Sequence, residues 1–283
     1  MKNHTMAIFL AAWLLFLAAH AGFNGAPAAY QEAAAESTVP VYLLEPAEAF
    51  QTVRSEDKAD RELASCDYQL LHLTAAVPET LPPAEAEAAR RSAEIFNARM
   101  DDLMEDFAGH GAAVGRDAKR AYQAGYLLEA YYDRVTASGV ITGRIVSVRM
   151  DQSSYTGGAH PNSYVSGCLF DLESGQFILD PAQLADDPAA FQAGAAEKLA
   201  EKAWAIRENR NAYWQDYTEI ISHWNEGVVL FDEEGMLAVY STYELGPYTM
   251  GEVELRLSWE ELAELMGPAA LTRFGVELPE GAE

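Results

Sequence analysis

The sequence is 283 residues long and strongly acidic, with 19 Lys and Arg residues against 44 Asp and Glu residues and a formal net charge of −25. This charge argues against nucleic acid as a partner, because the phosphate backbone is bound mainly by clustered Lys and Arg side chains. It favours a basic partner such as a cationic protein, although acidity also keeps an exported protein soluble. The length allows one large domain or two small ones.

The first 21 residues have the form of a secretory signal peptide. Lys2 precedes an apolar run from Met6 to Ala19, and Ala19-His20-Ala21 matches the small-residue pattern of a cleavage site. We therefore expect a cleaved signal and a protein that is secreted or lies on the outer face of the cytoplasmic membrane. The alternative is an uncleaved anchor, for which the run is almost long enough.

Residues 22–61 are rich in Ala, Glu, Gln and Pro, a composition typical of a flexible tether. A first sub-domain is expected over residues 62–152. It should begin with a strand that ends near Val77 and continue with a helix from Ala84 to Phe107, in which apolar residues recur at three- and four-residue steps. Three glycines then predict the end of this helix. Two strands joined at 137–139 should complete the sub-domain.

A second sub-domain is expected over residues 153–268, followed by a tail over 269–283. The predicted strands are 164–171, 176–179, 227–231, 236–243 and 252–257. The predicted helices are 181–184 after the capping residue Asp180, one that opens at Asp187-Pro188, and 259–266 after the capping residue Ser258. Because few strands are separated by crossover helices, we predict an α+β fold of antiparallel sheets with packed helices, in two sub-domains.

The sequence contains two cysteines, Cys66 and Cys168, one near the start of each expected sub-domain. In an exported protein they could form a disulfide that joins the two halves. The alternative is that both are buried, unpaired thiols, since sequence alone does not show whether their Cα atoms come within bonding distance. A metal or redox pair is disfavoured because no Cys-x-x-Cys spacing is present.

Two segments carry the most distinctive patterns. In residues 153–162, paired glycines and Pro161 predict a loop that leads into a strand, and residues 243–251 contain a second loop around Pro247-Tyr248. His160 resembles a catalyst or a metal ligand, yet no second His or Cys stands at ligand spacing, which favours a structural or recognition role. No Gly-x-Ser-x-Gly motif is present. We therefore assign no catalytic residue, no metal and no cofactor.

These two segments resemble the extracellular domain of the RsiV-like family. This family comprises membrane-bound anti-sigma factors that sense lysozyme. Their extracellular part consists of two domains, and the same two domains precede the catalytic domain of the peptidoglycan deacetylase PdaC. The resemblance rests on Tyr155-Thr156-Gly157-Gly158-Ala159-His160 and on Tyr243-Glu244-Leu245-Gly246-Pro247-Tyr248, and it extends over residues 62–266. Five residues precede the apolar run, so the family's anti-sigma activity is not expected here. The deacetylase's metal-binding domain is not expected either.

The resemblance implies a secreted or cell-envelope binding protein that recognises a protein ligand such as lysozyme. Loop residues beside the two motifs are then the expected contact surface, since Tyr combines an apolar ring with a polar tip. Its candidate ligand-binding residues are Ser153, Ser154, Tyr155, Thr156, Gly157, Gly158, His160, Pro247 and Tyr248. Packing of sheet corners would explain the same residues equally well. Two further alternatives are an envelope enzyme that acts on peptidoglycan through His160 and nearby acids, and a cell-wall glycan adaptor without catalysis.

Overall fold

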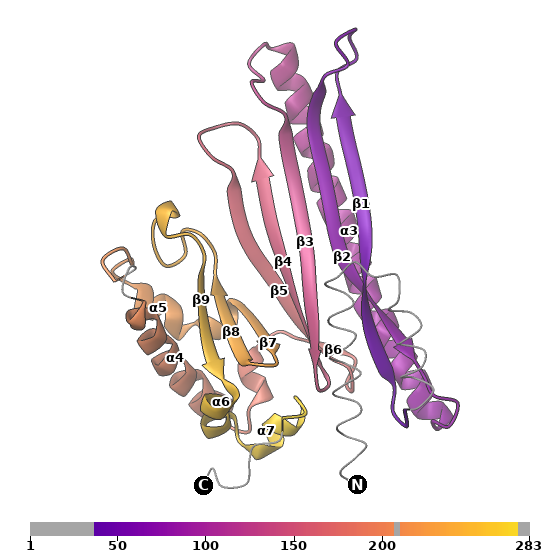
Figure 1. The fold of residues 1–283 in the computed structure, drawn as a ribbon, viewed down its shortest axis with the longest axis vertical. Coiled ribbons are helices and arrows are strands. Elements are labelled where there is room, and N and C mark those ends of the chain that lie inside the picture. Colours follow the sequence, from indigo (N-terminus) through magenta and orange to yellow (C-terminus); the bar gives the residue numbers. More distant parts are fainter. Residues whose placement is uncertain (1–36, 207–209, 277–283) are drawn as a thin grey trace.

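The computed structural model describes residues 37–206 and 210–276, which form two β-sheets and the helices that cover them (Figure 1). The expected signal peptide, the first part of the expected tether and the last residues of the expected tail lie outside these ranges. Most neighbouring strands are antiparallel, so the predicted α+β fold class is confirmed. None of the helices in the described ranges is long and apolar enough to cross a membrane.

The larger sheet has six strands in the order β1-β2-β3-β4-β5-β6. They are β1 Val41–Arg54, β2 Glu62–Ala76, β3 Tyr131–Thr142, β4 Ile145–Tyr155, β5 Asn162–Asp171 and β6 Gln176–Ile178. All neighbours pair antiparallel except β2 and β3, which are parallel and need a crossover connection. Helix α3 (Pro83–Gln123) is that connection, and Figure 1 shows it running along one face of the sheet.

Helix α3 is longer than the sequence predicts, because the glycines after Phe107 do not end it. Gly111 and Gly115 instead mark places where the helix backbone lies close to the sheet. A Cβ atom at Gly111 would lie 2.9 Å from Cys66 Sγ, and one at Gly115 would lie 2.7 Å from Val53 Cγ2. Glycine weakens an isolated helix by about 1 kcal/mol relative to alanine. Here close packing against the sheet offsets that cost.

The expected flexible tether is wrong for residues 41–54, which form the edge strand β1. Its pairing with β2 extends from Val41 opposite Ala76 to Arg54 opposite Glu62. The Ala- and Glu-rich composition concealed this strand, because its stability comes from a distant partner rather than from its own pattern. Pro46 is tolerated within it since an edge strand has one side without ladder hydrogen bonds.

The turn between β3 and β4 also differs from the prediction. The sequence suggested a connection at residues 137–139, but the hairpin turns at Gly143-Arg144. Gly143 has φ +59° and its backbone lies against the turn that follows α7, where Arg144 N donates to Arg273 O at 2.8 Å. A side chain at residue 143 would occupy the space of that turn. The contact with a remote segment, which sequence does not show, therefore fixes the place of the turn.

The smaller sheet has three antiparallel strands in the order β7-β8-β9. They are β7 Val228–Asp232, β8 Gly235–Tyr240 and β9 Val253–Ser258. Its helices are η1 Pro181–Leu184, α4 Pro188–Ala205, α5 Tyr217–Ser222, η2 Trp224–Glu226, η3 Tyr248–Met250, α6 Trp259–Met266 and α7 Pro268–Thr272. The predicted caps are confirmed: Asp180 accepts from Ala182 N, Asp187 accepts from Ala190 N, and Ser258 forms a capping box with Glu261. One face of this sheet packs on α4, α6 and α7 around Phe191, Phe231 and Phe274.

The other face and the β7 edge of the smaller sheet lie against the larger sheet. Val165 of β5 packs with Leu230 and Val239 in a small apolar cluster. Two buried hydroxyls complete the contact: Ser147 Oγ accepts from Phe231 N at 2.9 Å, and Ser241 Oγ accepts from Val165 N at 2.9 Å. These bonds satisfy backbone N–H groups that no strand partner reaches, so the two sheets form one continuous packed structure.

The expected boundaries of the sub-domains change accordingly. The boundary at 152/153 falls inside β4, because β4, β5 and β6 belong to the first sheet. The larger sheet thus spans residues 41–178, and the second sheet with its helices follows. The expected tail does not begin at 269 either, since α7 and the turn after it bury Phe274, which is 1% exposed.

Cys66 and Cys168 are both free thiols. Of the two alternatives, a disulfide between the halves or two unpaired thiols, the structure has the second. Cys66 lies on β2 and Cys168 on β5, with β3 and β4 between them. Three strand spacings amount to about 14 Å, twice the Cα separation that a disulfide tolerates. Burial also raises the pKa of the Cys168 thiol to about 12, which keeps it from reacting as a thiolate at neutral pH.

We expect two free thiols per chain in unfolded, unreduced protein, and slow alkylation of both in the folded state because Cys66 is fully buried and Cys168 stays protonated. Ellman titration with and without denaturant measures this. A Ser replacement at either cysteine should leave one thiol titrating normally in the unfolded chain. Absence of free thiol before reduction would contradict the structure.

Gly167 on β5 permits the close approach of the two sheets. A Cβ atom there would lie 2.8 Å from Val148 O and 3.2 Å from Leu230 Cδ2. We expect Gly167→Ala to lower the free energy of unfolding by about 1–3 kcal/mol, because the backbone at Val148 would have to shift to admit the new methyl group. Urea unfolding measures the change. Gly109→Ala is the control: its Cβ would meet nothing within 4 Å, so it should be at least as stable as the unchanged protein. A Gly167→Ala protein as stable as the unchanged protein would contradict the packing described here.

Candidate functional site

The two segments singled out in the sequence meet in space. The ring of His160, in the loop between β4 and β5, stacks on the ring of Tyr248, in the connection between β8 and β9. Their centroids are 4.1 Å apart and their planes differ by 23°. The ring centroid of Tyr248 in turn lies 5.7 Å from that of Tyr243. One loop from each sheet therefore contributes to a single aromatic surface.

Local hydrogen bonds and backbone geometry fix the β4–β5 loop. Gly157 and Gly158 have φ values of +94° and +115°, which side chains rarely adopt. The Tyr155 hydroxyl donates to Gly158 O at 3.2 Å across this turn. His160 Nδ1 lies 2.9 Å from Pro161 O, and since a carbonyl oxygen only accepts, Nδ1 carries the proton. The loop thus presents a defined imidazole ring to Tyr248.

The β8–β9 connection contains a strained residue. Tyr243 has φ +76°, a left-handed conformation that is uncommon for a bulky residue. Hydrogen bonds hold it there: Trp214 Nε1 donates to Tyr243 O at 3.1 Å, and the Glu244 carboxylate accepts from Ser241 N at 2.6 Å. The Tyr243 side chain remains 54% exposed. Strain of this kind is typical of functional loops, because the surrounding structure has to maintain it.

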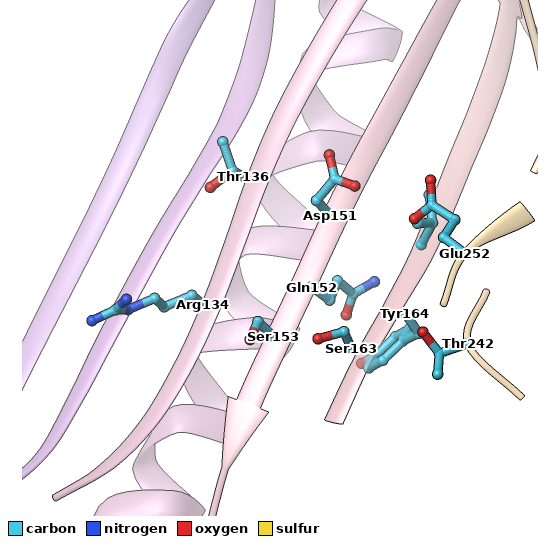
Figure 2. Close-up of a pocket in the computed structure, with 10 residues that line it drawn as sticks. Arg134, Thr136, Asp151, Gln152, Ser153, Ser163, Tyr164, Thr242 and Glu252 are labelled. Carbon is cyan, nitrogen blue, oxygen red and sulfur yellow. The ribbon is translucent and has the colours of Figure 1, made fainter. Parts of the chain in front are cut away.

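An open pocket of about 290 Å³ lies where the larger sheet meets Thr242 and Glu252 of the β8–β9 connection (Figure 2). Strands β3, β4 and β5 form its floor, and the smaller sheet forms one wall. Its lining residues are Arg134, Thr136, Asp151, Gln152, Ser153, Ser163, Tyr164, Val165, Thr242 and Glu252. Seven of the ten lining residues carry a hydroxyl or a carboxylate group, and Tyr164 is 50% exposed.

Arg149 joins the two sheets beside this pocket. Its guanidinium donates to Asp151 on β4 at 2.8 Å, and to Glu252 and Glu254 from the smaller sheet at 2.5 and 2.6 Å. The hydrogen bond with Asp151, followed by that with Glu252, raises the pKa of Arg149. Burial raises the pKa of Glu252, an effect that the hydrogen bond and charge of Arg149 oppose. Three carboxylates thus share one cation.

The structure brings most of the predicted site residues to one edge of the molecule. Ser153 lines the pocket, whereas Ser154 is on the opposite face of β4 because side chains alternate along a strand. Tyr155 packs against Tyr132, with ring centroids 6.0 Å apart. Thr156, Gly157, Gly158 and His160 form the β4–β5 loop, and Pro247 with Tyr248 faces it from the smaller sheet. Across residues 37–206 and 210–276, no group of three His, Cys, Asp or Glu side chains could hold a metal ion.

Sequence reasoning missed much of the pocket, including Arg134, Thr136, Asp151 and Glu252. A signal was present in the alternation of β3 and β4, where Arg134 pairs with Ser153 and Thr136 with Asp151 on one polar face. Glu252 approaches that face from a different sheet. No pattern in the sequence indicates this approach, since it depends on how the sheets pack.

Comparison with known proteins yields similarity of fold. No family model matches this sequence, and no curated protein matches it. A solved structure of a DUF3298 family member from Bacteroides fragilis has a TM-score of 0.57 and 13% identity, with 84% of this chain and 98% of that chain covered. A DUF3298 family protein from Pseudomonas aeruginosa has a TM-score of 0.51 and 15% identity, with 81% and 96% covered. At these identities the likeness shows the fold alone, and the RsiV-like resemblance stays a prediction.

The strain at Tyr243 leads to a prediction about stability. We expect Tyr243→Asn to leave the free energy of unfolding unchanged or to raise it by about 1 kcal/mol, because Asn tolerates the left-handed region better than Tyr. Urea denaturation measures this. Thr242→Asn is the control, since Thr242 has no positive φ and should show no gain. A loss above about 2 kcal/mol for Tyr243→Asn would mean that the ring is needed for packing.

Proposed function

We propose that this chain is a secreted or cell-envelope binding protein, and that the β4–β5 loop and the β8–β9 connection recognise a protein ligand. The observation that carries the proposal is the stacking of His160 on Tyr248 at 4.1 Å, which joins the two loops into one surface. Neither ring is buried by this contact, since both residues remain exposed. An aromatic pair that served only to pack a core would be covered instead.

The composition of this surface supports a protein ligand. Tyr164, Tyr243 and Tyr248 expose 50%, 54% and 36% of their area at the junction of the sheets. Exposed tyrosines are enriched at protein interfaces, where they contribute large contact area at small entropic cost. A hydrogen bond within the β4–β5 loop, and one from Trp214 to the β8–β9 connection, reduce the ordering that binding would otherwise require.

The charge and the sequence resemblance together favour a cationic ligand of lysozyme type. A net charge of −25 attracts basic proteins over distances of about 10 Å at 0.1 M salt. The RsiV-like motifs lie in the two loops that meet, and members of that family sense lysozyme. The fold shared with the DUF3298 structures is compatible with this function and does not select it.

The geometry does not favour an enzyme that uses His160. Its Nδ1 donates to Pro161 O and its ring stacks on Tyr248. The pocket carboxylates Asp151 and Glu252 are hydrogen-bonded to Arg149 rather than to His160. A general acid or base needs a hydrogen-bond path to the group on which it acts. Binding of a cell-wall glycan at the same surface is tested as one outcome of the titration described next.

Calorimetric titration of the chain with a c-type lysozyme, at low and at physiological salt, tests the proposal. We expect binding that weakens as salt increases, because screening reduces the attraction between opposite net charges. Tyr248→Ala should reduce the affinity by about 30-fold or more, corresponding to about 2 kcal/mol for a central aromatic contact.

Trp204→Ala is the matched control, because Trp204 is also exposed but lies on α4, on the far side of the smaller sheet. It should bind as the unchanged protein does. The absence of a heat of binding at low salt would rule out lysozyme as the ligand. Binding to purified wall glycan that is equally lost in Tyr248→Ala would assign the surface to an adaptor instead.

A further inference from the structure

A third segment of the chain meets the aromatic surface. It comprises residues 210–216, called the α4–α5 segment, and lies at the same end of the smaller sheet as the β8–β9 connection (Figure 1). Trp214 in this segment donates two hydrogen bonds to that connection, from its backbone N to Leu245 O at 2.9 Å and from its indole Nε1 to Tyr243 O at 3.1 Å. The two acceptors flank Glu244, so a single residue fixes the backbone on both sides of it.

The α4–α5 segment is itself supported by the core of the smaller sheet. The Tyr213 hydroxyl donates to Ala203 O of α4 at 3.0 Å, and the Tyr213 ring packs against the core. The segment also lies close to the β8–β9 connection, since a Cβ atom at Gly246 would be 3.0 Å from Ala212 O. Trp214 is therefore presented from a supported backbone.

The indole hydrogen bond of Trp214 acts on the strained residue of the aromatic surface. Tyr243 has φ +76°, a conformation that a bulky residue keeps only where its surroundings maintain it. The ring of Tyr243 adjoins that of Tyr248, which stacks on His160. The direction in which the Tyr243 ring meets Tyr248 therefore depends on the backbone to which the Trp214 indole binds.

Trp214 also has the exposure and the surroundings of a contact residue. It is 40% exposed, and tryptophan is among the residue types that are enriched at binding hot spots. Asp216 and Glu219, which follow it in the chain, are exposed. The one basic residue of the α4–α5 segment, Arg210, places its guanidinium 5.0 Å from the ring centroid of Trp204. An exposed ring bordered by negative charge fits a partner whose surface is basic.

We propose that Trp214 belongs to the recognition surface in two ways: its indole N–H positions Tyr243, and its exposed ring contacts the same basic protein ligand. The surface then has three parts, the β4–β5 loop, the β8–β9 connection and the α4–α5 segment. This inference rests on the proposed function, because it names the residue that prepares that surface for its ligand. Such pre-organisation raises affinity by lowering the entropy that is lost on binding.

The positioning role is tested on the chain without a ligand. Trp214→Phe keeps an aromatic ring and the backbone bond to Leu245 but loses the indole N–H. Trp259→Phe is the matched control, because Trp259 Nε1 donates to Asp232 O at 3.1 Å at the opposite end of the smaller sheet. A strong nuclear Overhauser cross-peak between the amide and α protons of one residue marks a positive φ. We expect this cross-peak of Tyr243 to weaken in Trp214→Phe and to persist in Trp259→Phe, with both variants shown to be folded by urea unfolding.

The contact role is tested with the isotope-labelled chain and unlabelled c-type lysozyme, so that only indole signals of this chain are observed. The signal that is lost in Trp214→Phe belongs to Trp214. We expect it to shift saturably with lysozyme, while the signal of Trp259 stays in place. In calorimetry, Trp214→Phe should weaken lysozyme binding about fivefold, the effect of one hydrogen bond of ordinary strength. Trp214→Ala should weaken it about 30-fold, because the ring contact is lost as well.

A double-mutant cycle connects Trp214 with the rest of the surface. The indole N–H acts through Tyr243 on the position of Tyr248, so the two changes should not be additive. In a Tyr248→Ala background, Trp214→Phe should therefore weaken lysozyme binding by less than about twofold. Trp259→Phe should bind as the unchanged protein does, and equal losses in Trp214→Phe and Trp259→Phe would overturn the proposal, because they would show a general effect on the fold.

The outcomes separate this inference from the proposed function. The absence of lysozyme binding would reject the proposed function, and the Tyr243 cross-peak in Trp214→Phe would then decide the positioning role: a weakened cross-peak would retain it and an unchanged one would reject it. Binding of lysozyme that is lost in Tyr248→Ala, with full affinity in Trp214→Ala and a stationary Trp214 signal, would retain the protein-binding surface and overturn this inference.

Discussion

The candidate site depends on the packing of β7 against β4 and β5. Two buried serines, Ser147 and Ser241, accept hydrogen bonds from backbone N–H groups of the opposite sheet. Gly167 allows the backbones to approach, and Val165 with Leu230 closes the space between them. Because a buried N–H without a partner costs about 1–3 kcal/mol, these bonds fix the position of one sheet on the other as well as their separation.

That fixed position explains why two distant loops behave as one surface. His160 and Tyr248 belong to different sheets, and only the alignment of the sheets places their rings 4.1 Å apart. Arg149 acts at the same junction, since its side chain from β4 binds Glu252 and Glu254 from the smaller sheet. A change in the angle between the sheets would alter the aromatic surface and the carboxylate cluster together. The proposed recognition surface and the packing of the sheets therefore depend on the same junction.

Local patterns predicted the elements that local interactions determine. The caps at Asp180, Asp187 and Ser258 were correct because each involves residues two or three positions away. The loop around His160 was also recognised, since paired glycines and a proline indicate a bend by themselves. Errors arose where a remote segment decides the outcome, as in β1, which depends on β2, and the turn at Gly143, which depends on Arg273. Of the ten residues that line the pocket, only Ser153 was among the candidates. The shared polar face of Arg134, Thr136 and Asp151 was not recognised, and Glu252 approaches it from another sheet.

The edge strand β1 has a consequence for association between copies of the chain. In the part of the chain that the structure describes, β1 pairs with β2 on one side only, and a strand edge of this kind is a template for strand addition and fibre formation. Pro46 removes one N–H donor near its middle, and Glu45 and Glu48 place negative charges on either side of it. Two such edges brought together would face like charges and an interrupted ladder. The residues whose composition suggested a loose tether thus oppose the addition of a second strand at this edge.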